Sequence, residues 1–311
     1  MSSAIGIDLG GTKCLAVALD EAGRVVAEHR VPTPEGAEAV LGTLEEVVQA
    51  LGGSDRIGVG VPGLVDRAGV LRFAPNLPGV VELDVRGELL ERFPDATVRV
   101  DNDATCATWA ETRVGAGRNL EWMVMITLGT GIGGGVVSGG KLERGAHGFA
   151  GEFGHMVVAP EGEGCVCGQQ GCWEFFASGR ALGRFAREAA AEGRAGRVLE
   201  LAGGDPDRVR GEHVTQACHE GDEWAAEILR RVGWWLGVGL VNLAMAFDPQ
   251  AFVIGGGLGA AGEPLLGPAR ATMHELLAGV PHRTPPDVLL AELGEHAGAV
   301  GAALLAVDEC G

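Results

Sequence analysis

The sequence has little basic charge and no long uninterrupted apolar run. Its 24 Lys and Arg residues are outnumbered by 42 Asp and Glu residues, so the formal net charge is −18. Such acidity argues against nucleic acid or an anionic membrane as a general partner. A membrane span needs about 18 consecutive apolar residues, and the sequence contains no such run. The N-terminus also lacks the basic region and apolar stretch of a signal peptide.

Cysteine is scarce too, with seven residues among 311. Without a secretory signal these cysteines indicate a reducing compartment, so we expect a cytoplasmic protein. Three of them, Cys165, Cys167 and Cys172, lie close together and follow His155 in the spacing H-x9-C-x-C-x4-C. A Cys3His set is one of the closed ligand sets of structural zinc, although buried or disulfide-bonded cysteines are the alternative. Their concentration in a cysteine-poor chain favours one zinc ion per chain.

Two acidic residues, Glu152 and Glu174, bracket the predicted zinc ligands. A purely structural zinc site has no need of them, so we expect the metal to brace a polar substrate site. The length of 311 residues suggests two domains. Because no linker of disordered composition separates them, we expect these domains to pack around a cleft.

Two glycine-rich hairpins share one plan. A β-rich run at 4–9 ends in Gly10-Gly11-Thr12-Lys13, and a second run at 122–128 ends in Gly129-Thr130-Gly131. Glycines let backbone N–H groups approach phosphate oxygens closely, although either loop alone could be an ordinary hairpin. The repeat of strand, Gly-Thr loop and strand predicts two similar lobes that face one phosphate chain. A third loop, Gly255-Gly256-Gly257, follows the strand at 251–254 and could let a flat ring lie against backbone.

Three polar residues, Asp101-Asn102-Asp103, follow the strand predicted at 98–100. Ligands of α/β sheets bind where strands end, so these side chains are candidates for catalysis. One of them is expected to cap the helix that follows at 104–115. At least one of the two aspartates is expected to be catalytic.

The remaining pattern alternates strands with amphipathic helices. Strands are predicted at 15–19, 25–31, 57–61, 136–138 and 288–290, and helices at 37–51, 85–93, 180–192, 198–202, 214–220, 224–247 and 296–307. The tryptophans Trp224, Trp234 and Trp235 are interpreted as core or subunit contacts.

Six of these motifs occur in an order and spacing that resemble the ROK family of repressors, open reading frames and kinases. They are DLGGTK at 8–13, DND at 101–103, LGTGIGGG at 128–135, GEFGH at 151–155, CVCGQQGCWE at 165–174 and IGGGL at 254–258. The likeness is strongest to the glucokinase branch. ROK repressors carry a further N-terminal helix-turn-helix domain, and this chain starts at its first strand, so the kinase branch is expected.

The resemblance implies an α/β protein with the two-domain, actin-like (ribonuclease-H-like) ATPase fold of sugar kinases. It implies a small domain of residues 1–106 plus 295–311 and a large domain of residues 107–294 that carries the zinc motif. It also implies a homodimer or homotetramer.

The resemblance further implies ATP-dependent phosphorylation of glucose at its 6-hydroxyl. Asp103 would be the general base, Asn102 would orient the neighbouring hydroxyl, and Asp8 would hold Mg²⁺ through water. Other implied sugar-binding residues are Gly63, Asn76, Glu152, His155 and Glu174. Other implied nucleotide-binding residues are Gly10, Gly11, Thr12, Lys13, Thr130, Gly131, Gly256 and Gly257. The implied zinc ligands are His155, Cys165, Cys167 and Cys172.

Glucose is the first choice of sugar. Trp173, Phe175 and Phe176 surround Glu174 in the sequence and leave little obvious room for an N-acetyl group. A kinase for N-acetylglucosamine or N-acetylmannosamine is the alternative. A sugar-sensing ROK regulator without catalysis is a further one, and it would be expected to lack the catalytic Asp or the glycine loops.

Overall fold

The computed structural model describes residues 4–165 and 167–308, and it divides the chain into two compact units. The first unit comprises the described parts of Met1–Met123, Gly134–Gly151 and Glu292–Gly311. The second comprises the described parts of Val124–Gly133 and Glu152–Ala291.

The first unit is built on a five-stranded sheet with the order β3-β2-β1-β4-β8. Its strands are β1 (Ala4–Leu9), β2 (Lys13–Leu19), β3 (Val25–Pro32), β4 (Arg56–Val61) and β8 (Thr97–Asn102). The pairs β3-β2 and β2-β1 are antiparallel, whereas β1, β4 and β8 run parallel. The ends of β1, β4 and β8 therefore meet at one edge of the sheet, which is where ligands of α/β sheets bind.

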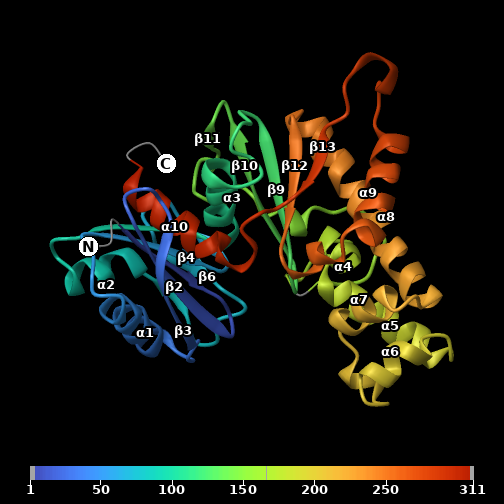
Figure 1. The fold of residues 1–311 in the computed structure, drawn as a ribbon, viewed down its shortest axis with the longest axis horizontal. Coiled ribbons are helices and arrows are strands. Elements are labelled where there is room, and N and C mark those ends of the chain that lie inside the picture. Colours follow the sequence, from blue (N-terminus) through green and yellow to red (C-terminus); the bar gives the residue numbers. More distant parts are fainter. Residues whose placement is uncertain (1–3, 166, 309–311) are drawn as a thin grey trace. The chain divides into compact units, whose positions relative to one another are not determined.

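Helices cover both faces of this sheet (Figure 1). Ile5 and Ile7 of β1 share a core with α1 (Ala37–Ala50) and α2 (Val85–Arg92), while Leu15 and Val17 of β2 pack against α10 (Ala297–Val307). The approach of α10 is close because a Cβ at Gly6 would overlap its backbone. Side chains that alternate between the two faces of each strand thus supply both cores.

The first unit reaches beyond the boundary predicted at residue 106. Helix α3 (Asp103–Val114) packs along α10, and a Cβ at Gly301 would overlap the backbone oxygen of Cys106. The buried Ala110 lies in the same core as Ala299 and Ala303. The whole of α3 and the segment up to Met123 therefore belong to the first unit.

A small antiparallel sheet of the first unit was not predicted from the sequence. It has the order β5-β6-β7, with β5 (Leu64–Val65), β6 (Leu71–Phe73) and β7 (Val81–Leu83). Strands of two or three residues are too short to show an alternating pattern.

A second five-stranded sheet has the order β11-β10-β9-β12-β13. Its strands are β9 (Met123–Leu128), β10 (Ile132–Ser138), β11 (Lys141–Leu142), β12 (Ala251–Gly255) and β13 (Asp287–Leu290). The helices of the second unit are α4 (Trp173–Ala177), α5 (Gly179–Ala191), α6 (Gly196–Leu201), α7 (Gly211–His219), α8 (Glu223–Phe247) and α9 (Glu263–Leu276). Short 3-10 turns are η1 (Phe153–His155), η2 (Pro206–Arg208), η3 (Gly257–Ala261), η4 (Val280–His282) and η5 (Gly294–His296).

Helix α8 is the longest element, with 25 residues. It begins where the Asp222 side chain accepts a hydrogen bond from Ala225 N, and it ends at Asp248, which has a left-handed backbone with φ 45°. Gly233 and Gly237 let α9 approach closely, because a Cβ at either would lie 2.5–2.6 Å from a backbone oxygen of α9. Small residues at the crossing thus set the packing of these two helices.

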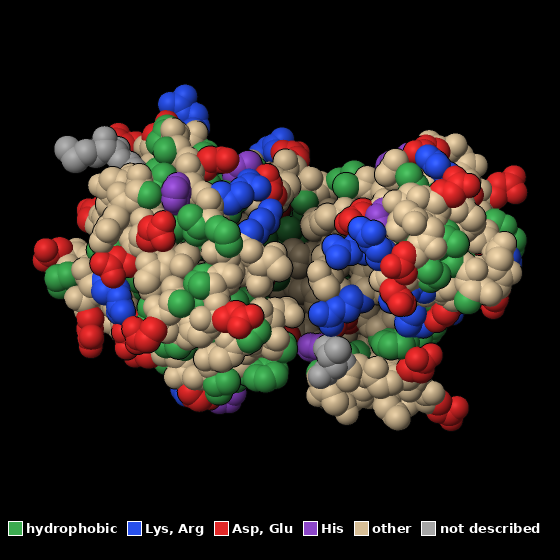
Figure 2. All heavy atoms as spheres, turned by 90° about the horizontal axis from the view of Figure 1, so that it is seen from below, with side chains coloured by type: hydrophobic (Ala, Val, Ile, Leu, Met, Phe, Trp, Pro, Cys, Tyr) green, Lys and Arg blue, Asp and Glu red, His purple; other side chains and the backbone are tan. Residues whose placement is uncertain are grey.

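The surface carries the acidic excess of the sequence in dispersed form. Figure 2 shows acidic side chains scattered over the visible face, with basic side chains gathered in small groups. Among the described residues, no helix is both long enough and apolar enough to cross a membrane.

Candidate functional site

The junction of β8 and α3 holds the three polar residues singled out in the sequence. Asn102 is the cap of α3, since its Oδ1 accepts hydrogen bonds from Ala104 N (2.9 Å) and Thr105 N (3.1 Å). Its Nδ2 donates to the backbone oxygen of Gly63 at 3.1 Å. Gly63 has φ 100° and no space for a Cβ, so this position requires glycine. Asn102 therefore ties the end of β4 to the start of α3.

Asp101 is committed to an ion pair. Its side chain is buried, its Oδ2 accepts from Arg144 Nε at 2.6 Å, and its Oδ1 accepts from Asn102 N at 2.9 Å. Both oxygens of this carboxylate are therefore already bonded within the protein and are not directed at a substrate. Asp103 is only half-buried and begins α3, where its Oδ1 accepts from Ala104 N at 2.8 Å. Asp103 is thus the better candidate for a general base.

The first glycine hairpin connects β1 and β2. Gly10 N donates to Lys13 O at 2.9 Å. Thr33, which directly follows β3, holds the loop by donating to Gly10 O (2.7 Å) and Thr12 O (3.1 Å). Asn76 lies against the loop, because a Cβ at Gly11 would come within 3.0 Å of Asn76 O. The loop therefore presents the amides of Gly11 and Thr12 next to the exposed Asn76.

Two charged residues flank this hairpin. Asp8 lies on β1 against Gly298 of α10, and burial raises its pKa to about 6, although the nearby Lys13 opposes the shift. Lys13 itself donates to Glu295 Oε2 at 2.8 Å. A partly buried carboxylate beside a phosphate-binding loop suits Mg²⁺, which prefers oxygen ligands.

The second glycine hairpin connects β9 and β10 and is held by the segment around α4. Gly129 N donates to Gly131 O (3.0 Å), and Gly129 O accepts from Gly179 N (2.9 Å). Ile132 N donates to Glu174 Oε2 at 2.9 Å. The hairpin thus repeats the plan of the first one, with its first glycine bonded back across the turn.

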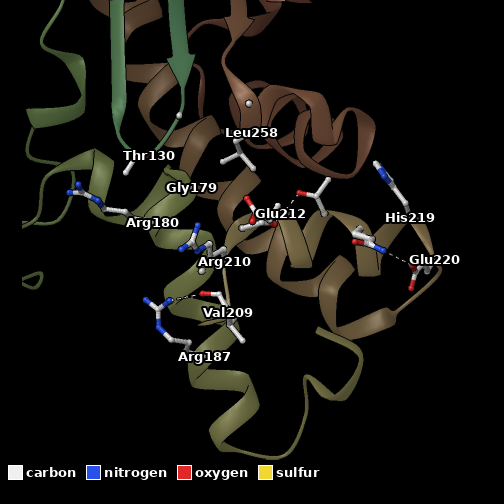
Figure 3. Close-up of a pocket in the computed structure, with 16 residues that line it drawn as sticks. Thr130, Gly179, Arg180, Arg187, Val209, Arg210, Glu212, His219, Glu220 and Leu258 are labelled. Carbon is white, nitrogen blue, oxygen red and sulfur yellow. Dashed lines mark hydrogen bonds between the residues drawn. The ribbon is translucent and has the colours of Figure 1, made fainter. Parts of the chain in front are cut away.

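A cavity of about 900 Å³ opens beside this hairpin in the second unit (Figure 3). Thr130 and Leu258 lie at one end of it, and α5 and α7 form its walls. Gly256 has φ 81°, and a Cβ at this position would overlap the backbone of Leu128. The third glycine loop therefore lies directly against the end of β9, next to the same hairpin. A cavity of this size suits a nucleotide or a small cofactor.

Sequence reasoning missed the basic lining of this cavity. It contains Arg180, Arg187 and Arg210, together with Glu212 and Gln216 of α7. Arg187 donates to Val209 O at 2.9 Å, a bond drawn in Figure 3. No motif marks these residues, because they come from separate segments that only the fold brings together.

The four predicted zinc ligands converge in the second unit. The ligand atoms of His155, Cys165, Cys167 and Cys172 all lie within 4.8 Å of one another. Cys165 Sγ is 3.8 Å from His155 Nδ1, and Cys167 Sγ is 3.6 Å from Cys172 Sγ. Sulfurs about 2.3 Å from a tetrahedral zinc would lie about 3.8 Å apart. The donor set and spacing therefore fit zinc; Val166, between two of the ligands, lies outside the described residues.

The acids beside this cluster form a charged group with His155. Burial raises the pKa of Glu152, the Glu174 carboxylate raises it further, and His155 opposes the shift. The three side chains are therefore near enough to interact electrostatically. Such a group of two carboxylates and an imidazole can bind the hydroxyls of a sugar.

The aromatic residues next to Glu174 are engaged elsewhere. Trp173 is fully buried and donates to Trp235 O at 2.7 Å, and Phe176 stacks on Trp235 with ring centroids 4.2 Å apart. The Arg184 guanidinium lies 4.0 Å from the centroid of Phe175. The crowding expected around Glu174 therefore finds no support, and these rings give no steric argument against an N-acetyl group.

Comparisons with known proteins agree over nearly the whole chain. A sequence model of the ROK family matches residues 4–309. The chain is 42% identical to a glucokinase of Streptomyces coelicolor over 316 aligned positions, which cover 98% of each chain. A crystal structure of a ROK family glucokinase from Streptomyces griseus in complex with glucose and AMPPNP aligns with 97% of this chain and 98% of its own, with a TM-score of 0.88 and 42% identity. An N-acetylmannosamine kinase of Escherichia coli is 36% identical over 98% of both chains.

Proposed function

Because the chain belongs to the ROK family, we propose that it is a glucokinase that transfers the γ-phosphoryl group of ATP to the 6-hydroxyl of glucose. The observation that carries this proposal is the near full-length agreement with the Streptomyces griseus enzyme, whose structure holds glucose and AMPPNP. The same relatives support the two-domain, actin-like fold of sugar kinases for this chain.

Nucleotide binding is proposed for both glycine hairpins. Phosphoryl transfer needs positioning and charge neutralisation more than covalent help, and backbone amides supply both. Asp8 would hold Mg²⁺, which would neutralise charge on the transferring phosphoryl group. The adenosine would occupy the arginine-lined cavity of the second unit. The residues proposed to contact the nucleotide are Gly10, Gly11, Thr12, Lys13, Thr130, Gly131, Gly256 and Gly257.

Sugar contacts are proposed for each unit by itself. Asp103 accepts the proton of the 6-hydroxyl as that oxygen attacks phosphorus, and Asn102 orients the neighbouring hydroxyl with the amide that also caps α3. Gly63 and Asn76 complete the sugar contacts of the first unit. In the second unit, Glu152, His155 and Glu174 would bind sugar hydroxyls.

A structural zinc ion is proposed for His155, Cys165, Cys167 and Cys172, whose donor atoms are spaced for a tetrahedral site. The Nδ1 of His155 faces Cys165 Sγ, so metal binding would fix the imidazole ring and direct its other nitrogen toward the sugar. The proposed location is the cytoplasm, because that compartment keeps cysteine thiols reduced and contains ATP.

A homodimer or homotetramer is proposed on the basis of one face of α8. Trp234 and Met245 are 44% and 53% exposed, and the half-buried Val238 and Val241 lie between them at helical spacing. An apolar stripe of this kind is typical of a subunit contact. Trp234→Glu should therefore shift the mass measured by light scattering toward the monomer. Trp224→Glu is the control and should leave the mass unchanged, because Trp224, although 40% exposed, packs its ring against Arg194. An unchanged mass in both variants would contradict the proposed subunit contact.

The proposal is tested by incubating the protein with ATP and Mg²⁺ and a panel of sugars that includes glucose, N-acetylmannosamine and N-acetylglucosamine. ADP should form in a glucose-dependent manner. Sugar binding without ADP formation would indicate a regulator instead. ADP formation with the acetylated sugars alone would favour the N-acetylmannosamine kinase relatives.

A further inference from the structure

The side chain of Glu174 contacts the proposed phosphate-binding hairpin and acts electrostatically on the proposed sugar-binding residue Glu152. On one side its charge acts on Glu152, which in turn interacts with His155. On the other side its Oε2 accepts the hydrogen bond of Ile132 N at 2.9 Å. Ile132 is the first residue of β10 and directly follows the proposed phosphate-binding residues Thr130 and Gly131.

The contact between Glu174 and the hairpin is close. A Cβ at Gly131 would overlap Glu174 Oε2, although Gly131 itself has no positive φ. The same segment holds the hairpin further on, through Gly179 N to Gly129 O (2.9 Å) and Arg180 N to Thr130 O (3.3 Å). A displacement of Glu174 must therefore alter the support of the hairpin.

Hydrogen bonds from a backbone N–H to a carboxylate are stronger than those to a neutral acceptor. Glu174 is also a proposed sugar ligand, so sugar hydroxyls that donate to its carboxylate would restrict the motion of this side chain. Glu174 would then be more firmly held where it accepts from Ile132 N. The hairpin is therefore more rigid when sugar is bound. Because less conformational entropy is then lost when the nucleotide binds, sugar tightens nucleotide binding.

We propose that Glu174 is a positioning residue that couples sugar binding to nucleotide binding through its bond to Ile132 N. This inference rests on the proposed kinase function and names a regulation of that same site. The coupling is reciprocal, so glucose must tighten nucleotide binding by the same factor by which the nucleotide tightens glucose binding.

The test is the Kd of AMPPNP with Mg²⁺, measured by calorimetry with and without saturating glucose. In the wild-type protein glucose should tighten AMPPNP binding by about fivefold or more. Gly131→Ala should bring this ratio close to one, because the added methyl displaces the Glu174 carboxylate. Gly129→Ala is the matched control, since it lies in the same loop, has no positive φ and places its Cβ where no atom lies within 4 Å. Even if Gly129→Ala changes the affinity for AMPPNP, the ratio of the Kd values without and with glucose should stay as in the wild type.

A second variant covers the case in which Gly131→Ala does not fold. Glu174→Ala, checked for folding by circular dichroism, should bind AMPPNP about fivefold or more weakly than wild type even without glucose. A wild-type ratio near one, an unchanged ratio in a folded Gly131→Ala, or an unchanged AMPPNP Kd in a folded Glu174→Ala would each overturn the coupling. Failure of the proposed kinase function would appear separately, as wild-type protein that forms no glucose-dependent ADP.

Discussion

At the scale of single residues, Asp103 and Asp101 differ in role although they are two positions apart. Asp103→Asn should lower kcat about 100-fold or more, because the amide cannot accept the proton of the 6-hydroxyl. Glucose binding should persist, since the amide still forms hydrogen bonds. Steady-state kinetics and glucose titration measure the two effects. Near-normal turnover in this variant would contradict the assignment of the base.

Asp101 provides the matched comparison. Asp101→Asn leaves the half-buried Arg144 without its ionic partner, so the free energy of unfolding should fall by about 3 kcal/mol. Asp103→Asn leaves the ion pair between Asp101 and Arg144 intact, so it should lose less stability than Asp101→Asn. Denaturant titration of both variants measures this difference, and equal losses of stability would argue against the separate roles.

Asp8 makes stability depend on pH. Its pKa is about 6 in the folded protein and about 3.8 when unfolded, so the folded state holds this proton more tightly. The stabilisation it gives is complete below pH ~4 and is lost as pH rises toward 6. Asp8→Asn removes this loss, so its stability relative to wild type should increase by about 3 kcal/mol between pH 4 and pH 7.

The measurement is denaturant unfolding of wild type and Asp8→Asn in EDTA without nucleotide, at several pH values. The exposed Asp95→Asn controls for the loss of one negative charge and should show no such trend. A stability difference between Asp8→Asn and wild type that stays constant with pH would contradict a raised pKa at Asp8.

At the scale of elements, the segment that runs through the zinc ligands into α4 supports the sugar site. Cys167→Ala should lose zinc and most activity together, because His155 and Glu152 lose their support. The zinc content found by metal analysis and the turnover rate should fall in parallel. Cys218→Ala, a half-buried cysteine outside the ligand set, should retain both. Full activity in protein that contains no zinc would reject the site.

Elements with long periodic patterns were predictable, and very short ones were not. The runs that became β1, β9 and α8 are visible in the sequence because their apolar residues recur at strand or helix spacing. The strands β5, β6 and β7 have only two or three residues and carry no such pattern.

Prediction of the candidate site from the sequence has the same limit. Sequence reasoning located the polar junction at 101–103 and the zinc cluster, because the residues of each lie close together in the chain. It left open which residue caps α3, and the structure identifies Asn102. The bond from Ile132 N to Glu174 and the arginine-lined cavity depend on tertiary contacts between distant segments, so no local pattern indicates them.

At the scale of the whole molecule, the predicted membership of the ROK family is confirmed by a match over residues 4–309. The residue boundaries of the first unit were less predictable than the family of the chain. It includes all of α3 because α10, which returns from the far end of the chain, packs along that helix. A contact between segments so far apart in the chain produces no local sequence signal at the domain boundary.

The choice of sugar is the central claim at this scale, and it rests on the relatives instead of on the aromatic residues near Glu174. A site that hydrogen-bonds the 2-hydroxyl of glucose leaves polar groups unpaired with an N-acetylated sugar, which discriminates strongly between the two. The most direct test is kcat/KM for glucose, N-acetylglucosamine and N-acetylmannosamine in one coupled assay with saturating ATP and Mg²⁺. We predict that glucose exceeds both acetylated sugars by about 100-fold or more. A higher kcat/KM for either acetylated sugar would contradict the assignment as a glucokinase.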